Sequence, residues 1–417
     1  MQNDKSSDAK NSIKFLVAAE DKYPPFRVDV KVLFAEEMTA KGHDVDWLLQ
    51  SEDSCRQPYA TEWSGCRVYV GATNLGSTRL SRVDKHLKGL ANDFRMFGLA
   101  SKNGYDVIQI KDKILSALLA IIAARKNGSK FTYWLSYPFP EASIYEAKTG
   151  VARFPFLYYI RGVVFKFLLY RVIARWADHF FVQSEQMKRD VIKEGVSPEK
   201  LTAVPMGISE EMFSKLASVN TENVNLGKAS IVYLGTLLKT RKLEFAIKVL
   251  KEVLLKEPEA MLYMVGPEEQ EGDIAVLKQE AISLGVEDKV IFTGRLPQHE
   301  ALAYVSSAAV CISPFFPTPI LNSTSPTKLI EYMAFKKAVV ANDHPEQSLV
   351  ITASGGGLCV PYDVNDFAGA IVKILSNPDM AKDMGAKGYD YVMKHRTYDK
   401  LSDLINNVYL GLVSDRS

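Results

Sequence analysis

The residues best suited to chemistry lie in the stretch 325–342, SPTKLIEYMAFKKAVVAN. Lys328 stands in the first turn of a predicted helix, where its charge adds to the free N–H groups and the positive end of the helix dipole. Such a site binds anions, and phosphate groups above all. Glu331 follows one turn after Thr327, where a carboxylate can accept hydrogen bonds from two neighbouring hydroxyls, as a ribose presents them. The stretch therefore predicts half of a nucleotide site.

A helix followed by a buried strand must hold these side chains. Ser325 is a good N-cap, and Pro326 suits the first helical position, whose N–H the helix would leave unpaired. The helix is predicted to end at 335–337, and 338–341 is an apolar run typical of a parallel strand covered on both faces. An ordinary capped helix of any α/β protein has the same features, so this stretch alone leaves both interpretations open.

Length and composition narrow the class of protein. The 417 residues suit two domains. The net charge of +2 and the pI of about 8.1 argue against a generic nucleic-acid binder, which carries a concentrated basic surplus. The four cysteines have no metal-ligand spacing, so we expect a reduced cytoplasmic protein without a zinc site. The polar residues 1–12 predict neither a signal peptide nor an anchor.

Strands alternate with helices along the whole chain, which predicts α/β architecture with doubly wound parallel sheets. Before a polar linker at 219–227, predicted strands are 14–19, 44–49, 67–71, 106–110, 131–135 and 179–183, with helices at 30–41 and 113–126 and a helix capped by Ser184. After it, predicted strands are 230–234, 261–265, 290–292, 310–313, 338–341 and 358–360, with helices at 243–256, 366–376, 380–394 and 401–412. No strand is followed by G-x-G-x-x-G, which disfavours a dehydrogenase.

The serine-proline-x-lysine start, the Glu-Tyr-Met-Ala core and the Val-Val-Ala strand resemble the donor-binding signature of family 4 glycosyltransferases, the retaining enzymes of GT-B architecture. The resemblance covers nearly the whole chain, with its specific motifs at 235–363. It implies two Rossmann-like domains facing a cleft: an N-terminal acceptor-binding domain at 1–218 and a C-terminal donor-binding domain at 219–395. A final helix at 396–417 would cross back to the N-terminal domain.

The same resemblance assigns the donor site. The family places a basic residue six positions after a strand-end glycine, and here these are Arg241 and Gly235. Arg241 and Lys328 would act in catalysis as cations that stabilise the departing diphosphate. The implied donor-binding residues are Gly235, Thr236, Arg241, Gly266, Arg295, Ser323, Thr324, Ser325, Thr327, Lys328, Leu329 and Glu331. The donor is a nucleotide sugar carrying UDP or GDP, and neither a cofactor nor a metal is expected.

The sequence departs from the family pattern in two places. Ser323 stands where many members carry an acid that contacts the transferred sugar, so hydroxyl and amide groups of 322–324 would replace it or the sugar would differ. The loop 21–29 carries Pro24, Pro25 and Arg27 where members usually carry paired glycines.

Three residues are candidates for the acceptor side, because ligands of parallel sheets bind at the carboxyl ends of strands. They are Arg27, Asp112 and Glu141, each in a segment that follows a predicted strand. Simple solvation at the surface is the alternative for each.

The expected function is transfer of a sugar to a hydroxyl acceptor, a glycan or a lipid-linked molecule, in polysaccharide or glycolipid synthesis. A catalytically idle GT-B domain that binds a nucleotide sugar or a partner subunit is the alternative, and a sugar-nucleotide epimerase is a third possibility.

The aromatic and basic segment 151–178 has charges that exclude a spanning helix. It is either a mostly buried helix with one solvent-exposed face or an interfacial helix that holds the protein at the inner face of a membrane.

Overall fold

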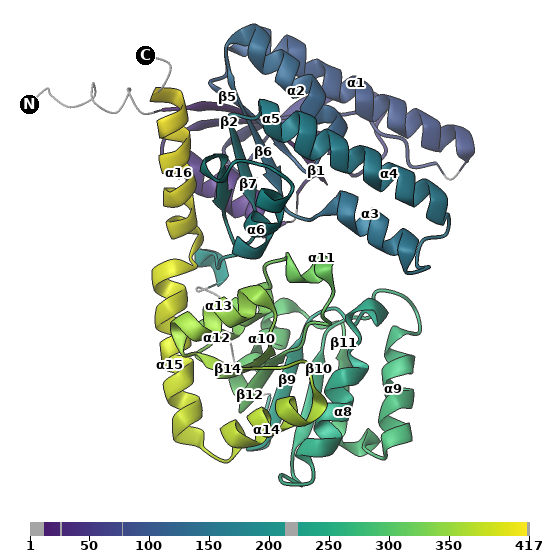
Figure 1. Ribbon diagram of the computed structural model, residues 1–417, viewed down its shortest axis with the longest axis vertical. Coiled ribbons are helices and arrows are strands. Elements are labelled where there is room, and N and C mark those ends of the chain that lie inside the picture. The colour runs from purple at the N-terminus through teal and green to yellow at the C-terminus, as the bar shows by residue number, and fades with distance from the viewer. Residues whose placement is uncertain (1–11, 26, 77, 213–223, 415–417) are drawn as a thin grey trace, which may run out of the picture. The chain divides into compact units, whose positions relative to one another are not determined.

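The computed structural model describes residues 12–25, 27–76, 78–212 and 224–414 (Figure 1). The chain forms two compact units: the residues up to Pro205 together with those from Tyr398 onward, and the residues from Met206 to Thr397. The chain thus passes from the first unit to the second between Pro205 and Met206. The boundary expected at 218 and the start of the expected linker, 219–223, lie outside the described residues.

The first unit contains an eight-stranded sheet in the order β3-β4-β2-β1-β5-β6-β7-β8. Its strands are β1 (Lys14–Tyr23), β2 (Asp44–Ser51), β3 (Tyr59–Trp63), β4 (Cys66–Gly71), β5 (Val107–Lys111), β6 (Lys130–Leu135), β7 (His179–Val182) and β8 (Leu201–Ala203). Every neighbouring pair is parallel except β3 and β4. The sequence did not predict β3, because its five residues are half-buried or exposed at the sheet edge and show no apolar run.

Helices cover both faces of this sheet. Residues of α1 (Arg79–Asn103), α2 (Ile114–Asn127) and the π-helical η3 (Leu168–Ile173) share one core with the strands. The π-helical η2 (Asp29–Met38) and α16 (Tyr398–Ser414) share the core on the other face. The unit also contains α3 (Phe139–Lys148), α4 (Pro155–Phe167), α5 (Ala174–Trp176), α6 (Glu185–Lys193) and η4 (Pro198–Lys200).

Of two local expectations for the first unit, one changed in detail and one is confirmed. The strand expected at 14–19 continues to Tyr23, because Lys22 and Tyr23 pair with Gln50 and Ser51 of β2 after a register shift. The predicted cap is confirmed, since the Ser184 hydroxyl accepts a hydrogen bond from the Met187 N–H at 2.9 Å.

The second unit contains a six-stranded parallel sheet in the order β11-β10-β9-β12-β13-β14. Its strands are β9 (Ser230–Leu234), β10 (Met261–Val265), β11 (Val290–Gly294), β12 (Val310–Ser313), β13 (Val339–Asn342) and β14 (Gly357–Val360). The strand order reverses at β9, which lies between β10 and β12. Ligands of open α/β sheets bind at the carboxyl ends of strands beside such a reversal.

The helices of the second unit lie on both faces of its sheet, because alternate residues of β9 join two different cores: Tyr233 joins one and Val232 the other. They are η5 (Lys239–Arg241), α8 (Glu244–Val253), α9 (Asp273–Leu284), η6 (Glu287–Lys289), α10 (Gln298–Ser307), α11 (Pro319–Asn322), α12 (Thr327–Ala334), α13 (Pro345–Ser354), α14 (Val364–Leu375) and α15 (Pro378–His395). The prediction of two parallel-sheet α/β domains is confirmed.

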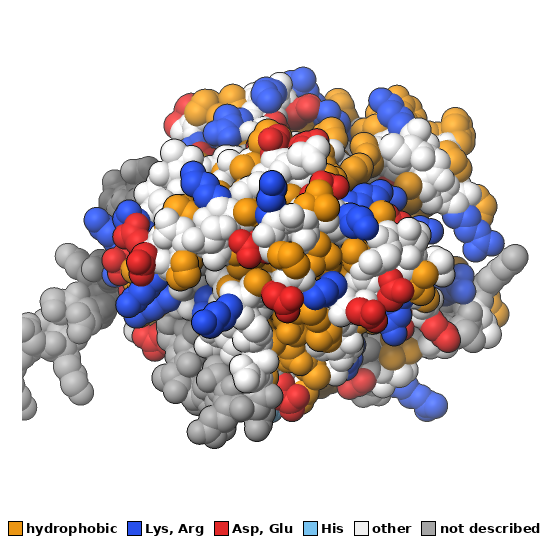
Figure 2. All heavy atoms as spheres, turned by 90° about the horizontal axis from the view of Figure 1, so that it is seen from below, with side chains coloured by type: hydrophobic (Ala, Val, Ile, Leu, Met, Phe, Trp, Pro, Cys, Tyr) orange, Lys and Arg blue, Asp and Glu red, His pale blue; other side chains and the backbone are white. Residues whose placement is uncertain are grey.

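Charges of both signs are mixed on one face of the molecule. On the face shown in Figure 2, Lys and Arg side chains lie among Asp and Glu side chains and form no continuous basic surface over the described atoms. This distribution is unlike the concentrated basic surface typical of nucleic-acid-binding proteins.

Candidate functional site

Two glycines meet at the carboxyl end of β9. Gly235 follows β9 and has a φ of 147°, and Gly266 follows β10 and has a φ of 140°, conformations that glycine adopts without strain. A Cβ on Gly266 would lie 2.4 Å from the carbonyl oxygen of Gly235. The two turns therefore require glycine both for conformation and for space.

Arg241 and Lys328 converge on the same glycine. A Cβ on Gly235 would lie 2.2 Å from Cε of Lys328 and 3.2 Å from Nη1 of Arg241. Arg241 ends η5, in the connection from β9 to α8, and Lys328 lies in the first turn of α12. Both side chains are half-buried. Neither forms an ion pair with a carboxylate among the described residues, so both charges remain available to an anion.

Tyr233 lies beside both cations, although sequence analysis treated it only as a strand residue. Its hydroxyl accepts a hydrogen bond from Nη1 of Arg241 at 3.1 Å, and Nζ of Lys328 lies 5.6 Å from the centroid of its ring. The aromatic face attracts the ammonium. The sequence gives little indication of this role, because a tyrosine within an apolar strand is typical of a core residue.

Tyr332 fixes α12 to the end of β9. Its hydroxyl accepts a hydrogen bond from the backbone N–H of Leu234 at 2.8 Å, and its ring is fully buried. The first turn of α12 is thereby held next to Gly235. The sequence contains no signal of this contact, because Tyr332 and Leu234 are distant in the chain.

The predicted N-cap of α12 is wrong. The cap residue is Pro326, which makes no side-chain hydrogen bond, and the helix begins at Thr327. The Ser325 hydroxyl instead accepts a hydrogen bond from the N–H of Met206 at 3.0 Å. A proline cap has no side-chain acceptor, so no cap side chain competes with an anion for the N–H groups of the first turn.

Burial shifts the protonation of the two charged residues of α12. Burial lowers the pKa of Lys328; the nearby Tyr233 hydroxyl opposes this shift and Arg241 adds to it. Burial raises the pKa of Glu331, and Lys328 opposes that shift. Each charged form is therefore less favoured here than in water. A ligand that brings a negative charge to Lys328 and hydroxyl donors to Glu331 would favour both.

The remaining donor-side candidates differ in what they offer a ligand. Thr236 and Thr327 are half-buried near the glycine turns and the start of α12, whereas Arg295 is exposed after the edge strand β11. Leu329 is packed in the core, so only its backbone could meet a ligand.

Ser323 and Thr324 offer little to a ligand through their hydroxyls. Ser323 is buried, and the Thr324 hydroxyl donates to the carbonyl of Leu321 at 2.7 Å. Asn322, at the end of α11, is half-buried and is the freer of the three positions expected to replace the sugar-side acid.

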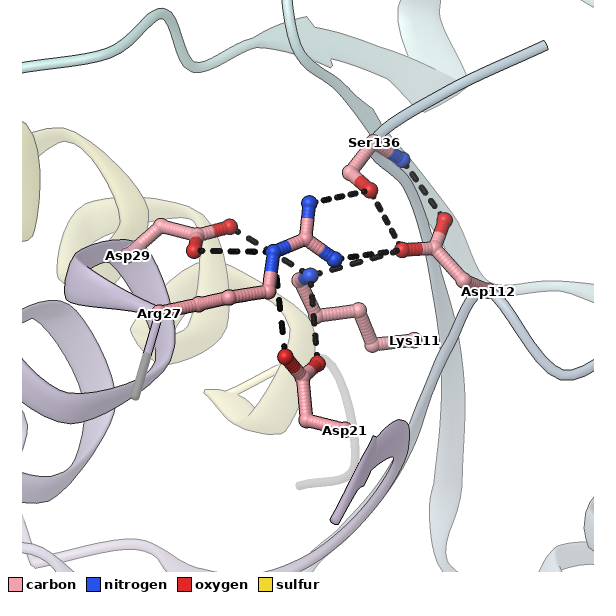
Figure 3. A network of polar contacts seen from close by, with 6 residues as sticks. All are labelled: Asp21, Arg27, Asp29, Lys111, Asp112 and Ser136. Carbon is pink, nitrogen blue, oxygen red and sulfur yellow. Dashed lines mark hydrogen bonds and ion pairs between the residues drawn. The ribbon is translucent and has the colours of Figure 1, made fainter. Parts of the chain in front are cut away.

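The first unit contains a second polar cluster, which we call the Arg27 network: Asp21, Arg27, Asp29, Lys111, Asp112 and Ser136 (Figure 3). These residues lie at or beyond the carboxyl ends of β1, β5 and β6, which are neighbours in the sheet. Two of them, Arg27 and Asp112, are candidates predicted from the sequence. Asp21 and Asp29 could have been found as carboxylates on either side of Arg27 in the sequence.

Arg27 is at the centre of this network. Its Nε lies 3.7 Å from Asp21 and 3.8 Å from Asp29, its Nη1 lies 3.8 Å from Asp112, and its Nη2 donates to the Ser136 hydroxyl at 3.3 Å. Burial alone would lower the pKa of Arg27, but the three carboxylates outweigh it and raise the pKa. The side chain is 35% exposed, so Arg27 is the member that a ligand could reach.

Lys111 and Asp112 anchor the buried part of the network. Nζ of Lys111 lies 3.3 Å from both Asp29 and Asp112 and 3.6 Å from Asp21. The Asp112 carboxylate is fully buried and accepts hydrogen bonds from the N–H of Ser136 at 2.8 Å and from the Ser136 hydroxyl. Asp112 has a φ of 61°, which aspartate tolerates better than most residues. The Asp112 carboxylate is thus fully engaged by Lys111 and Ser136 and does not face solvent.

Glu141 lies apart from this network. It lies in the first turn of α3, its carboxylate lies 3.9 Å from Nζ of Lys166, and burial raises its pKa. The structure therefore brings Arg27 and Asp112 together but shows no contact between Glu141 and either of them among the described residues. The described part of the chain also contains no cluster of three His, Cys, Asp or Glu side chains that could hold a metal ion.

Two family models match the chain. Residues 32–207 match the model described as "Glycosyl transferase 4-like domain", and residues 215–391 match the model described as "Glycosyl transferases group 1". The two matches fall on the two halves of the chain and together take in most of it.

Curated relatives are similar over part of their length. A Bacillus subtilis (strain 168) protein, named as a glycosyltransferase of teichuronic acid biosynthesis, is 28% identical over 261 residues, 58% of this chain and 63% of that protein. The alpha-monoglucosyldiacylglycerol synthase of Streptococcus pneumoniae (strain ATCC BAA-255 / R6) is 24% identical over 294 residues, 68% of this chain and 62% of that protein. The chain thus spans less than two thirds of the length of these relatives.

Solved structures share the fold. Sucrose-phosphate synthase from Thermosynechococcus elongatus has a TM-score of 0.69 at 19% identity, covering 96% of this chain and 100% of that chain. HepE from Anabaena, in complex with UDP and glucose, has a TM-score of 0.66 at 13% identity, covering 95% of this chain and 99% of that chain. At these identities the likeness shows the fold alone.

Proposed function

Since the chain belongs to the family 4-like glycosyltransferases of GT-B architecture, we propose that it transfers a sugar from a nucleotide-diphosphate-sugar donor to a hydroxyl acceptor. One observation carries this proposal: the side chains of Arg241 and Lys328 converge over Gly235 at the carboxyl end of β9, where the strand order reverses. Neither cation pairs with a carboxylate in the described part of the chain, so a diphosphate would supply the missing negative charge.

The two cations act on the leaving group. As the bond between sugar and diphosphate breaks, negative charge grows on the phosphate oxygens, and fixed positive charges stabilise that state more than the bound donor. Arg241 offers two parallel N–H groups to the phosphate oxygens, and Lys328 adds a point charge at the start of α12. Glu331 accepts hydrogen bonds from the two ribose hydroxyls, which compensates its burial.

We propose a retaining outcome, which rests on the family resemblance. In that mechanism the departing phosphate oxygen accepts the proton of the acceptor hydroxyl, so no side chain serves as nucleophile. Arg241 and Lys328 neutralise the negative charge of the diphosphate in place of a metal, and we propose that transfer requires no metal or cofactor.

The donor and acceptor follow from the relatives. HepE has been crystallised with UDP and with UDP-glucose, so we propose a UDP-sugar, with GDP as the alternative. One relative is named as a glycosyltransferase of teichuronic acid biosynthesis, and another is named as an alpha-monoglucosyldiacylglycerol synthase. These names support a glycan or lipid-linked acceptor. Arg27, the partly exposed member of its network, is the candidate for the acceptor side. Because nucleotide sugars are made in the cytoplasm, we propose that the protein works there.

The test is release of nucleoside diphosphate from UDP- and GDP-sugars, with and without glycan and glycolipid acceptors, alongside thermal unfolding with each donor. A ligand at about one hundred times its Kd raises stability by roughly 2.7 kcal/mol. Transfer that is lost in Arg241→Ala but kept in Lys239→Ala, an exposed cation of the same turn, supports the proposal. Donor binding without release or transfer would identify a catalytically idle binding domain, and a changed sugar on the nucleotide would identify an epimerase.

A further inference from the structure

Large apolar side chains are exposed along three helices of the first unit, α1, α2 and α4. We call them the outer apolar surface. Its members are Leu80, Val83, Leu87, Leu90 and Phe94 in α1, Leu115 and Ile122 in α2, and Phe156, Leu157, Tyr159, Ile160, Val163, Val164 and Phe167 in α4. Single exposed apolar residues are ordinary, but a concentration of this kind on three helices of one unit marks an interaction surface.

α1 and α2 carry these exposed side chains in addition to a complete inner face, whereas Gly162 is the buried residue of α4. Met96 and Ala100 of α1 and Ala117, Ala120 and Ala124 of α2 are buried in one core against the sheet. The outer side chains are therefore not needed to hold the helices in place. Leu80 is 83% exposed and Phe156 is 74% exposed, which is far from the burial that a side chain of the core requires.

In α1 the outer residues form a single stripe. Positions 80, 83, 87, 90 and 94 recur at alternating intervals of three and four residues, so their side chains lie along one side of the helix. Met96 and Ala100 belong to the opposite, buried side. The helix is thus apolar on two sides, one facing the core and one facing solvent.

The outer face of α4 results from its close packing against α3. A Cβ on Gly162 would lie 2.6 Å from Cγ1 of Ile144 and 2.8 Å from the carbonyl oxygen of Pro140, so the two helices approach at this glycine. At 100° per residue, the exposed apolar residues of α4 occupy the side away from Gly162. Arg161 and Lys166 border that apolar side on its two edges.

The charge around this surface has one sign over long segments. Residues 113–130 and 151–177 contain no Asp or Glu. Their exposed cations are Arg125, Lys126, Arg153, Arg161, Arg171 and Arg175. In α1, Asp84 pairs with Lys88 at 2.9 Å and Asp93 is buried beside Lys113, while Arg82 is exposed. The exposed cations of these two segments therefore have no carboxylate within their own segments, although the half-buried Lys166 pairs with Glu194 at 2.7 Å.

We propose that the outer apolar surface docks on a lipid bilayer rich in anionic headgroups. Insertion of the apolar side chains removes them from water, and the surrounding cations meet the negative surface potential of the bilayer. No described helix is both long and apolar enough to cross a membrane. A second copy of the chain fits less well, because a two-fold contact would bring one surface bordered by cations against an identical surface of the same charge.

The proposal goes beyond sugar transfer and is tested without a donor. The full chain is mixed with vesicles of phosphatidylcholine alone or of phosphatidylcholine with phosphatidylglycerol, and bound protein is separated by flotation. We expect flotation with the anionic vesicles, weaker flotation with the neutral ones, and loss of binding as salt is raised, because salt screens the charge attraction.

Matched variants locate the contact. Leu157→Glu and Leu87→Glu replace leucines that are each 61% exposed, and Leu255→Glu replaces a leucine of the second unit that is 68% exposed. The first two are expected to lower partitioning onto anionic vesicles about tenfold, the effect of withdrawing roughly one apolar side chain from the lipid. Leu255→Glu is expected to leave binding unchanged. Thermal unfolding of each variant verifies the fold.

Cations are tested in the same way. Arg153→Gln combined with Arg175→Gln should reduce binding to anionic vesicles and leave the weaker neutral binding unchanged, whereas Lys256→Gln in the second unit should change neither. The proposal is overturned if the folded chain fails to float with either kind of vesicle. It is equally overturned if Leu157→Glu and Leu255→Glu have the same effect on vesicle binding. It is also overturned if light scattering finds a dimer that Leu157→Glu converts to a monomer, because the surface would then bind a second copy. Sugar transfer measured in parallel separates this outcome from failure of the proposed enzymatic function.

Discussion

Arg241 donates a hydrogen bond to the hydroxyl of Tyr233 at 3.1 Å. Arg241 lies in the connection after β9, and Tyr233 lies near the end of β9 itself. Lys328, 5.6 Å from the centroid of the same ring, approaches from α12. One aromatic side chain therefore positions two cations that arrive from different segments of the chain. Because the ring is buried, neither cation can move far without losing a partner that the protein itself supplies.

Removing either cation should affect turnover more than donor binding. Arg241→Ala and Lys328→Ala are expected to lower kcat by about 10²- to 10³-fold, with a smaller rise in the Kd of the donor, because charge on the diphosphate is greatest in the transition state. Steady-state kinetics and calorimetric donor titration give the two values, and Lys239→Ala is the control. Normal kcat in a folded Lys328→Ala protein would place the active site elsewhere.

Adding a methyl group to Gly235 should disable the site. The new Cβ of Gly235→Ala would lie 2.2 Å from Cε of Lys328, and the φ of 147° is unfavourable for any residue with a Cβ. We expect loss of transfer together with a lower thermal unfolding temperature. Gly369→Ala, in the interior of α14 with open space at its Cβ, should instead keep activity and add about 0.5–1 kcal/mol of stability. Equal effects of the two changes would contradict this interpretation.

Tyr332→Phe removes the acceptor for the N–H of Leu234, which lies 2.8 Å from the hydroxyl. An unsatisfied donor in a largely buried position costs about 1–3 kcal/mol in the free energy of unfolding. We expect that loss in urea titrations, and a lower kcat because α12 is no longer held to β9. Tyr304→Phe, a half-buried tyrosine of the same unit, serves as the comparison. A stability equal to that of the unmodified protein would show that this hydrogen bond does not hold the helix.

Donor affinity should fall at both ends of the pH range. Lys328 binds the diphosphate as an ammonium, and burial lowers its pKa, so affinity is full below that lowered pKa and falls as pH rises through it. Glu331 binds the ribose as a carboxylate, and burial raises its pKa, so affinity falls as pH drops through that raised value. Calorimetric titration of UDP-glucose over a pH series measures both limbs.

Two variants separate these limbs. Lys328→Arg keeps its charge at high pH and should remove the alkaline fall. Glu331→Gln has no titrating group and should remove the acidic fall while weakening binding throughout. Identical pH profiles for the variants and the unmodified chain would exclude both residues from the donor site.

The Arg27 network should be structural at its buried end. Asp112→Asn removes a fully buried negative charge that faces Arg27 and Lys111, and breaking buried pairs of this kind costs about 3–5 kcal/mol in the free energy of unfolding. Urea denaturation should show this loss, whereas Asp383→Asn, from the exposed pair with Lys387, should cost about 0.5 kcal/mol or less. A loss of transfer with unchanged stability would instead give Asp112 a direct role with the acceptor.

Periodicity and turn residues were sufficient to predict most of the architecture. β9, β10 and β12 have the bounds expected from their apolar runs, because a strand buried on both faces shows its whole length in its composition. The local pattern also placed Gly235, Arg241, Lys328 and Glu331 beside helix starts and strand ends. These features depend on residues near one another in the chain, and local sequence determines them.

Tertiary structure decided which partners those residues have. Ser325 has the side chain of an N-cap, but its hydroxyl bonds to Met206, which is near it only in the fold. The sequence predicts Asp112 as a candidate to bind an acceptor, but in the structure its carboxylate is buried against Lys111 and Ser136. Tyr233 and Tyr332 support the site through contacts whose partners come from separate elements. Such contacts depend on how distant elements pack, and the periodicity of a single segment contains no information about which distant segment it will pack against.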